Sequence, residues 1–280
     1  MEAILFVGHG SRDAEGNREL LRFTEKMAPQ FAEPIVETCF LELAEPDMGA
    51  GVKRAVERGA TSIKVVPLML FMAGHAKVHI PLFLHEAQAQ YPHVRFTYGR
   101  PLEVDELILP ILEARIQQAA GANEAEETSI LLVGRGSSDA GANSDLYKIA
   151  RLLWERLNVP WVEACFIGVT DPRMEAGLER CVRLGAKRVV VLPYFLFTGV
   201  LIKRMEKMVR QFNEESAGVH AEMVPYLGFD DGLVPIWQRR VHQLAHGQAL
   251  NWQALAEQAI AAGHHQHHHD HDHHHGHHHA

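Results

Sequence analysis

The sequence repeats itself with an offset of 126 residues, and the two copies align without a gap across roughly 70 residues. The aligned identities include Gly8 with Gly134, Gly10 with Gly136, Ser11 with Ser137, Asp13 with Asp139, and Asn17 with Asn143. Further along, ETCFLELAEP (37–46) aligns with EACFIGVTDP (163–172), and RGATSIKVVPLMLF (58–71) aligns with LGAKRVVVLPYFLF (184–197). Because 280 residues can form two small domains, the repeat predicts two homologous domains.

Each half alternates short apolar runs with segments of helical spacing. In the first half this pattern predicts strands at 4–8, 35–42, 62–70 and 95–99, and helices at 16–28, 48–58, 78–89 and 106–119. Strands that are apolar along nearly their whole length are typical of parallel sheets buried on both faces. The alternation therefore predicts βαβ units and the α/β class.

The predicted organisation is two domains and a tail. The first domain covers 1–121, its repeat covers 128–250, and the polar stretch GANEAEET (121–128) links them. The segment 263–280 contains twelve histidines, broken by Gln266, Asp270, Asp272 and Gly276, and it has too little apolar surface to join a core. An expression tag is the alternative, but tags are rarely interrupted in this way, so we predict a disordered metal-binding tail.

Charge and cysteine content narrow the function classes. The net charge of −8 argues against nucleic acid or an anionic membrane as the main partner. The three cysteines form no C-x-x-C pair, which favours a reduced cytoplasmic protein. The first apolar run is too short for a signal peptide, and the longest one, 189–202, is too short to span a membrane.

Three potential metal ligands, His9, Glu42 and His75, each follow a predicted strand of the first half. Ligands of open α/β sheets bind beyond the carboxyl ends of the strands, so these side chains are expected to lie at one edge. In the second half the aligned residues are Arg135, Gly168 and Leu201, so all three ligands are lost together. The joint loss indicates one unit, and two imidazoles with a carboxylate suit a divalent transition metal with open coordination positions.

Other interpretations of these residues remain open at this point. His9 could simply bond to its own loop and His75 could cap a helix, and His79 could either join His75 across one turn or be exposed. The Gly-His-Gly turn is a weak phosphate-loop candidate, because no G-x-G-x-x-G or G-K-[ST] pattern is present. Four cations near the expected mouth are either solvated charges or partners of an acidic ligand: Arg12, Lys77, Arg135 and Lys203.

Three motifs together resemble the sirohydrochlorin chelatases, the class II chelatases of cobalamin and sirohaem synthesis. They are GHGSRD (8–13), FLELAEP (40–46) and AGHAKVHIP (73–81), and the resemblance extends over both halves to about residue 245. It implies a chelatase-like fold with a four-stranded parallel sheet in each domain and an active site between the domains. The sequence departs from the family at His79, where an acidic residue is expected, and it lacks a C-terminal C-x-x-C motif.

The resemblance also implies the chemistry. His9 and His75 would be the metal-binding and catalytic histidines and Glu42 would assist them, with sirohydrochlorin as substrate. No organic cofactor would be needed, because the divalent metal, Co²⁺ or Fe²⁺ with Ni²⁺ a further alternative, is itself a substrate. Arg135 would pair with substrate carboxylates, and the glycines around His9 would leave room for a flat macrocycle.

The expected function is insertion of Co²⁺ into sirohydrochlorin in cobalamin biosynthesis, because the histidine-rich tail of this chain resembles the tails of cobalt-type members. Three alternatives stand beside it: a ferrochelatase of sirohaem synthesis, a metal-storage or metallochaperone protein, and a flavodoxin-like phosphate-binding module. The chain is expected to be a cytoplasmic monomer whose halves form an internal pseudo-dimer, without nucleic-acid or membrane partners.

Overall fold

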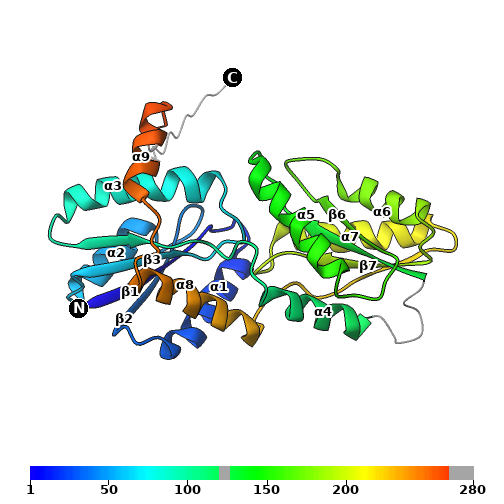
Figure 1. The fold of residues 1–280 in the computed structure, drawn as a ribbon, viewed down its shortest axis with the longest axis horizontal. Coiled ribbons are helices and arrows are strands. Elements are labelled where there is room, and N and C mark those ends of the chain that lie inside the picture. Colours follow the sequence, from blue (N-terminus) through cyan, green and yellow to red (C-terminus); the bar gives the residue numbers. More distant parts are fainter. Residues whose placement is uncertain (120–126, 265–280) are drawn as a thin grey trace, which may run out of the picture.

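Two four-stranded parallel sheets, one in each half of the chain, form the centre of the structure (Figure 1). This structure is a computed structural model, and it describes residues 1–119 and 127–264. The strand order is β2-β1-β3-β4 in the first sheet and β6-β5-β7-β8 in the second. The expected α/β class and the four-stranded parallel sheets are confirmed.

The elements follow the predicted alternation. The first half contains β1 (Glu2–Gly8), α1 (Ala14–Met27), η1 (Ala28–Gln30), β2 (Ile35–Phe40), α2 (Met48–Glu57), β3 (Ser62–Pro67), η2 (His75–His79), α3 (Ile80–Gln90), β4 (Arg95–Tyr98) and α4 (Ile108–Ala119). The second half contains β5 (Thr128–Gly134), α5 (Ala140–Trp154), β6 (Trp161–Phe166), α6 (Met174–Arg183), β7 (Arg188–Pro193), α7 (Val200–Glu215), β8 (His220–Met223), η4 (Asp231–Leu233), α8 (Val234–Ala245) and α9 (Trp252–Ala261).

Strand register brings the carboxyl ends of the central strands to one edge of each sheet. In the first sheet Gly8 pairs with Phe40 and Val7 pairs with Pro67. The second sheet repeats this register with Gly134 opposite Phe166. The loops that leave these strands therefore begin side by side, which is the place where open α/β sheets bind ligands.

Helices α4 and α8 each pack on the sheet of the other half. Helix α4 lies against α5 and β7, and α8 lies against β3 (Figure 1). Polar contacts join the same surfaces, because Arg115 of α4 pairs with Asp230 at 3.1 Å and Arg240 of α8 donates to the Pro101 carbonyl oxygen at 2.8 Å. The packing thus crosses the predicted boundaries near 121 and 128, which separate the sequence repeats.

The exchange of helices produces one apolar cluster that runs through both halves. It combines residues of β1 and α1 with residues of β5, α5, α4 and α8. Two further clusters cover the outer faces, one beneath α2, α3 and α9 and one beneath α6 and α7. Because the shared cluster spans both halves, it holds the two sheet edges in a defined relation to each other. In the described part of the chain, no helix is long and apolar enough to cross a membrane.

Candidate metal site and interdomain cleft

The turn after β1 places His9 between two glycines that are tightly packed. A Cβ atom on Gly8 would lie 2.2 Å from Leu20, and one on Gly10 would lie 1.7 Å from the carbonyl oxygen of Glu42. Gly10 also has a left-handed φ of 87°. The expectation that these glycines leave room for a macrocycle is wrong, because protein atoms fill both places.

Side chains that are identical in the two halves stabilise this turn through hydrogen bonds. Asn17 donates to the Ser11 carbonyl oxygen at 2.7 Å, and the Ser11 hydroxyl accepts from the Asp13 backbone N–H at 3.0 Å. Asp13 in turn caps α1 by accepting from the Glu15 N–H. The second half repeats the whole arrangement from Ser137 to Asn143. The repeated serine, aspartate and asparagine therefore serve the turn, while the residue at its tip differs between the halves.

Glu42 reaches His9 because the β1–β2 pairing continues beyond the strands. The Leu41 N–H donates to the Gly8 carbonyl oxygen at 2.8 Å, and the Glu42 N–H donates to the His9 carbonyl oxygen at 3.1 Å. These bonds leave a Glu42 carboxylate oxygen 3.6 Å from His9 Nε2.

His75 begins η2, a single wide π-helical turn that leads into α3. The buried phenol of Tyr98 donates to the Ala76 carbonyl oxygen at 2.7 Å and so ties this turn to β4. Helix α9 packs on both η2 and α3 from outside. π-Helical turns of this kind are frequent at functional sites.

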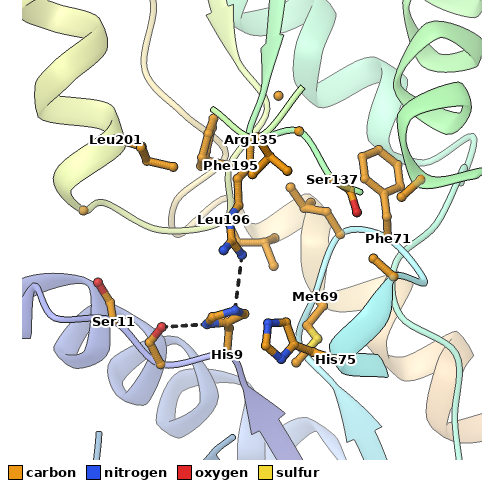
Figure 2. Close-up of a pocket in the computed structure, with 18 of the residues that line it drawn as sticks. His9, Ser11, Met69, Phe71, His75, Arg135, Ser137, Phe195, Leu196 and Leu201 are labelled. Carbon is orange, nitrogen blue, oxygen red and sulfur yellow. Dashed lines mark hydrogen bonds between the residues drawn. The ribbon is translucent and has the colours of Figure 1, made fainter. Parts of the chain in front are cut away.

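The structure brings His9, Glu42 and His75 together as the sequence predicts. One ligand atom from each residue lies within 4.8 Å of the others. The two imidazole rings meet edge to face with centroids 4.4 Å apart, and Figure 2 shows them side by side at the floor of a pocket. Two nitrogens and one carboxylate oxygen on one side leave the opposite coordination positions open, which suits an ion that must be passed on.

Local hydrogen bonding determines which nitrogen of His9 faces the site. His9 Nδ1 lies 3.0 Å from the Gly10 carbonyl oxygen, so Nδ1 carries the hydrogen and donates it. In the neutral ring Nε2 therefore bears the lone pair, and it is Nε2 that faces Glu42. Metal-binding histidines usually have their other nitrogen held in this way.

Both histidines are held in the neutral form that binds metals. Burial is the main cause for each ring, and it lowers the pKa of His9 and lowers the pKa of His75 to about 4. The bond to the Gly10 carbonyl raises the pKa of His9 in part, and the His9 ring lowers the pKa of His75 further. The Arg135 guanidinium and the His79 ring lower both pKa values, and Glu42 raises both.

Arg135 meets His9 across the interface between the halves, although the two residues occupy equivalent positions in the repeat. The guanidinium donates to His9 Nε2 at 3.2 Å (Figure 2). The pseudo-twofold axis that relates the halves therefore passes between these two side chains. Arg135 places a positive charge at the same nitrogen to which a metal ion would bind.

A cleft of about 900 Å³ opens over this site, and both halves line it. Apolar side chains dominate its walls, among them Phe71 from the first half and Phe195, Leu196 and Leu201 from the second (Figure 2). Leu201 thus gives the second half an apolar surface at the position equivalent to His75. The cleft combines a cluster of potential metal ligands on one side with apolar walls that suit a flat ring system.

The model of the CbiX family matches residues 3–119 and 129–244. The chain belongs to the CbiX family. It is 48% identical to a sirohydrochlorin cobaltochelatase of Priestia megaterium over 251 residues, covering 89% of this chain and 81% of that protein. It is 39% identical to a sirohydrochlorin ferrochelatase of the same organism over 244 residues, covering 87% and 91%. The resemblance inferred from the three motifs is confirmed.

A solved structure supports the same membership in the CbiX family. The crystal structure of the sirohydrochlorin chelatase SirB from Bacillus subtilis subspecies spizizenii in complex with cobalt superimposes with a TM-score of 0.75 at 33% identity. The match covers 88% of this chain and 96% of that one.

The four predicted cations do not behave alike in this CbiX protein. Arg12 and Arg135 line the cleft, and Arg12 makes no hydrogen bond or ion pair with any residue that the structure describes. Lys77 pairs instead with Asp139, and Lys203 pairs with Asp13 at 2.7 Å. These two pairs are equivalent under the 126-residue repeat, so the halves are joined by a reciprocal pair of ion pairs beside the cleft.

His79 lies against His75, with their Nδ1 atoms 2.9 Å apart. One of these nitrogens must donate and the other must accept, so the proton on each ring depends on the other ring. His79 also lines the cleft. The two alternatives for His79 were contact with His75 across one helical turn and an exposed position. The structure shows both features together, because the ring contacts His75 and the residue is exposed.

Some features of the site were not predicted from the sequence. Tyr98 gave no signal, because its role depends on a hydrogen bond to a turn more than twenty residues away. The contact between His9 and Arg135 could have been suspected, because residues at equivalent positions of a repeat meet wherever a twofold axis passes. His264, the first described histidine of the tail, lines the cleft, and the rest of the tail lies outside the described residues.

Proposed function

We propose that this protein inserts Co²⁺ into sirohydrochlorin. The observation that carries the proposal is the cluster of His9, Glu42 and His75 on one wall of an apolar cleft. Membership in the CbiX family and 48% identity to a cobaltochelatase support the substrate and the metal. Metal chelation is the enzyme class of the named relatives, cobalt-type and iron-type alike.

The metal would be held first by His9 Nε2, His75 and Glu42. Arg135 must leave His9 Nε2 before a cation can bind there, because a guanidinium and a divalent ion repel each other. The acidic side chains of the tetrapyrrole offer Arg135 a better partner, since a guanidinium binds carboxylates in a bidentate way. We propose that substrate binding draws Arg135 away from His9 and so frees the metal site.

The reaction exchanges two pyrrole N–H protons for the divalent ion, so the protein must accept two protons for each ion that it releases. The neutral imidazoles of His9 and His75 can each take one proton once they let go of the metal, and Glu42 stabilises the resulting charge. Insertion and proton uptake are thus coupled at the same atoms. No organic cofactor enters this scheme.

The arginines and the lysines are expected to differ in substrate binding. Substituting alanine for Arg135 should raise KM for sirohydrochlorin about tenfold and largely preserve kcat, because it removes a charged hydrogen bond to the substrate. Lys77→Met and Lys203→Met are matched controls, since both lysines are already paired with aspartates. We expect their KM values to stay within about twofold of wild type and their melting temperatures to change little, because exposed ion pairs contribute little to stability.

Steady-state kinetics of the four proteins at saturating metal measure this difference. A larger rise in KM for the lysine variants than for Arg135→Ala would assign the carboxylate contacts to the lysines, as the sequence alone allows. A collapse of kcat in Arg135→Ala at unchanged KM would remove Arg135 from substrate binding.

The proposed metal preference is tested by insertion assays with Co²⁺, Fe²⁺ and Ni²⁺ side by side under anaerobic conditions. We expect the highest kcat/KM with Co²⁺, and the absorption spectrum of the product reports each reaction. Preference for Fe²⁺ would favour the ferrochelatase alternative, which the 39% identical relative represents. No insertion with any of the three ions would reject the chelatase function.

The histidine-rich tail is proposed to gather metal for this cleft. The tail begins beside the cleft, because α9, which precedes it, packs on η2 and the tail's first histidine, His264, lines the cleft. A truncation after Gly263 should lose activity at limiting metal and match the full-length protein at saturating metal. Equal rates at both metal concentrations would leave the tail without this role, and loss of insertion at saturating metal would favour the storage alternative. A monomeric state and a cytoplasmic location remain predictions.

A further inference from the structure

Two aliphatic residues on the cleft have an unusual backbone conformation. Leu43 has a φ of 62° and Val169 has a φ of 63°, both in the left-handed region that side chains disfavour. The two positions are equivalent under the repeat of 126 residues. Each residue lies one position after the site of a metal ligand or its replacement, Glu42 in the first half and Gly168 in the second.

Neither side chain is explained by packing within the protein. Leu43 is 54% exposed and Val169 is 56% exposed, and neither belongs to any of the apolar clusters of the described residues. Glycine adopts this backbone conformation without strain, and a β-branched residue such as valine is among the least suited to it. An exposed aliphatic side chain on a strained backbone indicates a contact that the protein makes with something else.

The comparison of the halves narrows down what that contact is. The second half has lost all three metal ligands, yet it keeps an aliphatic left-handed residue beside the lost glutamate. A metal ion is approached from one wall of the cleft, but a flat macrocycle lies against both walls. Because both halves retain this feature, contact with the macrocycle explains it better than contact with the metal ion does.

The position of the two residues agrees with this interpretation. Both line the cleft over the metal site, one from each half. The axis between the halves passes near His9 and Arg135, so Leu43 and Val169 lie on opposite sides of it. The backbone of Gly10 lies close to the Leu43 loop, because a Cβ atom on Gly10 would lie 1.7 Å from the Glu42 carbonyl oxygen. Gly136 has the same relation to the Val169 loop, where a Cβ atom would lie 2.3 Å from the Gly168 carbonyl oxygen.

We propose that Leu43 and Val169 make apolar contacts with the sirohydrochlorin macrocycle, one from each wall of the cleft. These two contacts position the macrocycle over His9 and His75. The inference rests on the proposed function and adds two residues that position the substrate. The strained backbone aims each side chain into the cleft, where contact with the ring system removes its apolar surface from water.

The test compares Leu43→Gly and Val169→Gly with wild type in two independent measurements. Glycine relieves the strain, so we expect the melting temperature of the free protein to rise by about 2 °C. Loss of the side chain should weaken binding of metal-free sirohydrochlorin about tenfold, read from the fluorescence of the tetrapyrrole. A structural role would lower stability, so the opposite signs of the two effects are diagnostic.

Two further variants serve as controls. Glu103 also has a left-handed φ, of 56°, but does not line the cleft, so Glu103→Gly should raise stability without changing substrate binding. Leu43→Ala keeps the strain and removes most of the side chain, so it should weaken binding without raising stability.

Each outcome decides the proposal. Unchanged affinity in both glycine variants, or a fall in stability that accompanies the loss of affinity, would overturn the role of Leu43 and Val169. Failure of the wild-type protein to bind sirohydrochlorin would instead reject the proposed function, and that result is visible before any variant is made.

Discussion

Substituting alanine for His75 or His9 is expected to lower the rate of metal insertion by about 10²–10⁴-fold while leaving the fold intact. In the proposed mechanism each imidazole serves twice, since it holds the ion before transfer and accepts a pyrrole proton afterwards. His9 lies in the loop after β1 and His75 begins the turn η2, and both are only partly buried, so their removal opens no cavity in the core. Loss of either ring also leaves Glu42 with a single nitrogen partner for the ion.

The measurement combines single-turnover insertion, metal binding and circular dichroism of the folded proteins. His85→Ala and His93→Ala are matched controls, because both histidines are exposed and neither lines the cleft. Wild-type turnover in His75→Ala would contradict the site. A variant that binds Co²⁺ normally but inserts it slowly would separate the proton-accepting role from the holding role.

The sequence was sufficient to predict the strands and the main helices of the first half, and to predict that His9, Glu42 and His75 lie together. The repeat acts as an internal comparison, because turns keep their serine, aspartate and asparagine wherever the backbone needs them, from Ser11 to Asn143. Against that constant background the differences at His9, Glu42 and His75 stood out. Parallel register then brought all three residues to one edge, since loops after adjacent strands begin side by side.

What the sequence could not predict depends on contacts between the halves. The exchange of α4 and α8 leaves each helix with an ordinary amphipathic pattern, so nothing in the pattern indicates which sheet it covers. The lysines illustrate the same limit: Lys77 and Lys203 looked like free charges near the mouth, and each is paired with an aspartate of the opposite half. The glycines around His9 were misinterpreted because their neighbours, Leu20 and the Glu42 carbonyl, come from other elements.

The pH dependence of insertion should follow the histidines of the site and not an ordinary histidine. Burial lowers the pKa of His75 to about 4, well below the reference value of about 6.5. Only the neutral ring binds metal or accepts a proton, so activity should persist as the pH falls through 6.5 and decline as it approaches 4. Initial rates at saturating Co²⁺ from pH 8 to pH 4 test this expectation, and a midpoint near 6.5 would contradict the burial of the ring.

The same shift in pKa predicts a change in stability with a definite sign. The unfolded chain takes up a proton on His75 near pH 6.5, whereas the folded protein does so only near 4. Between these values the unfolded state binds more protons, so the free energy of unfolding decreases as the pH falls through this window and is highest above it. His75→Ala lacks this group and should therefore lose less stability than wild type between pH 7 and pH 4, as measured by thermal unfolding. Equal losses in the two proteins would mean that His75 titrates alike in the folded and unfolded states, and the neutral imidazole would then need another explanation than burial.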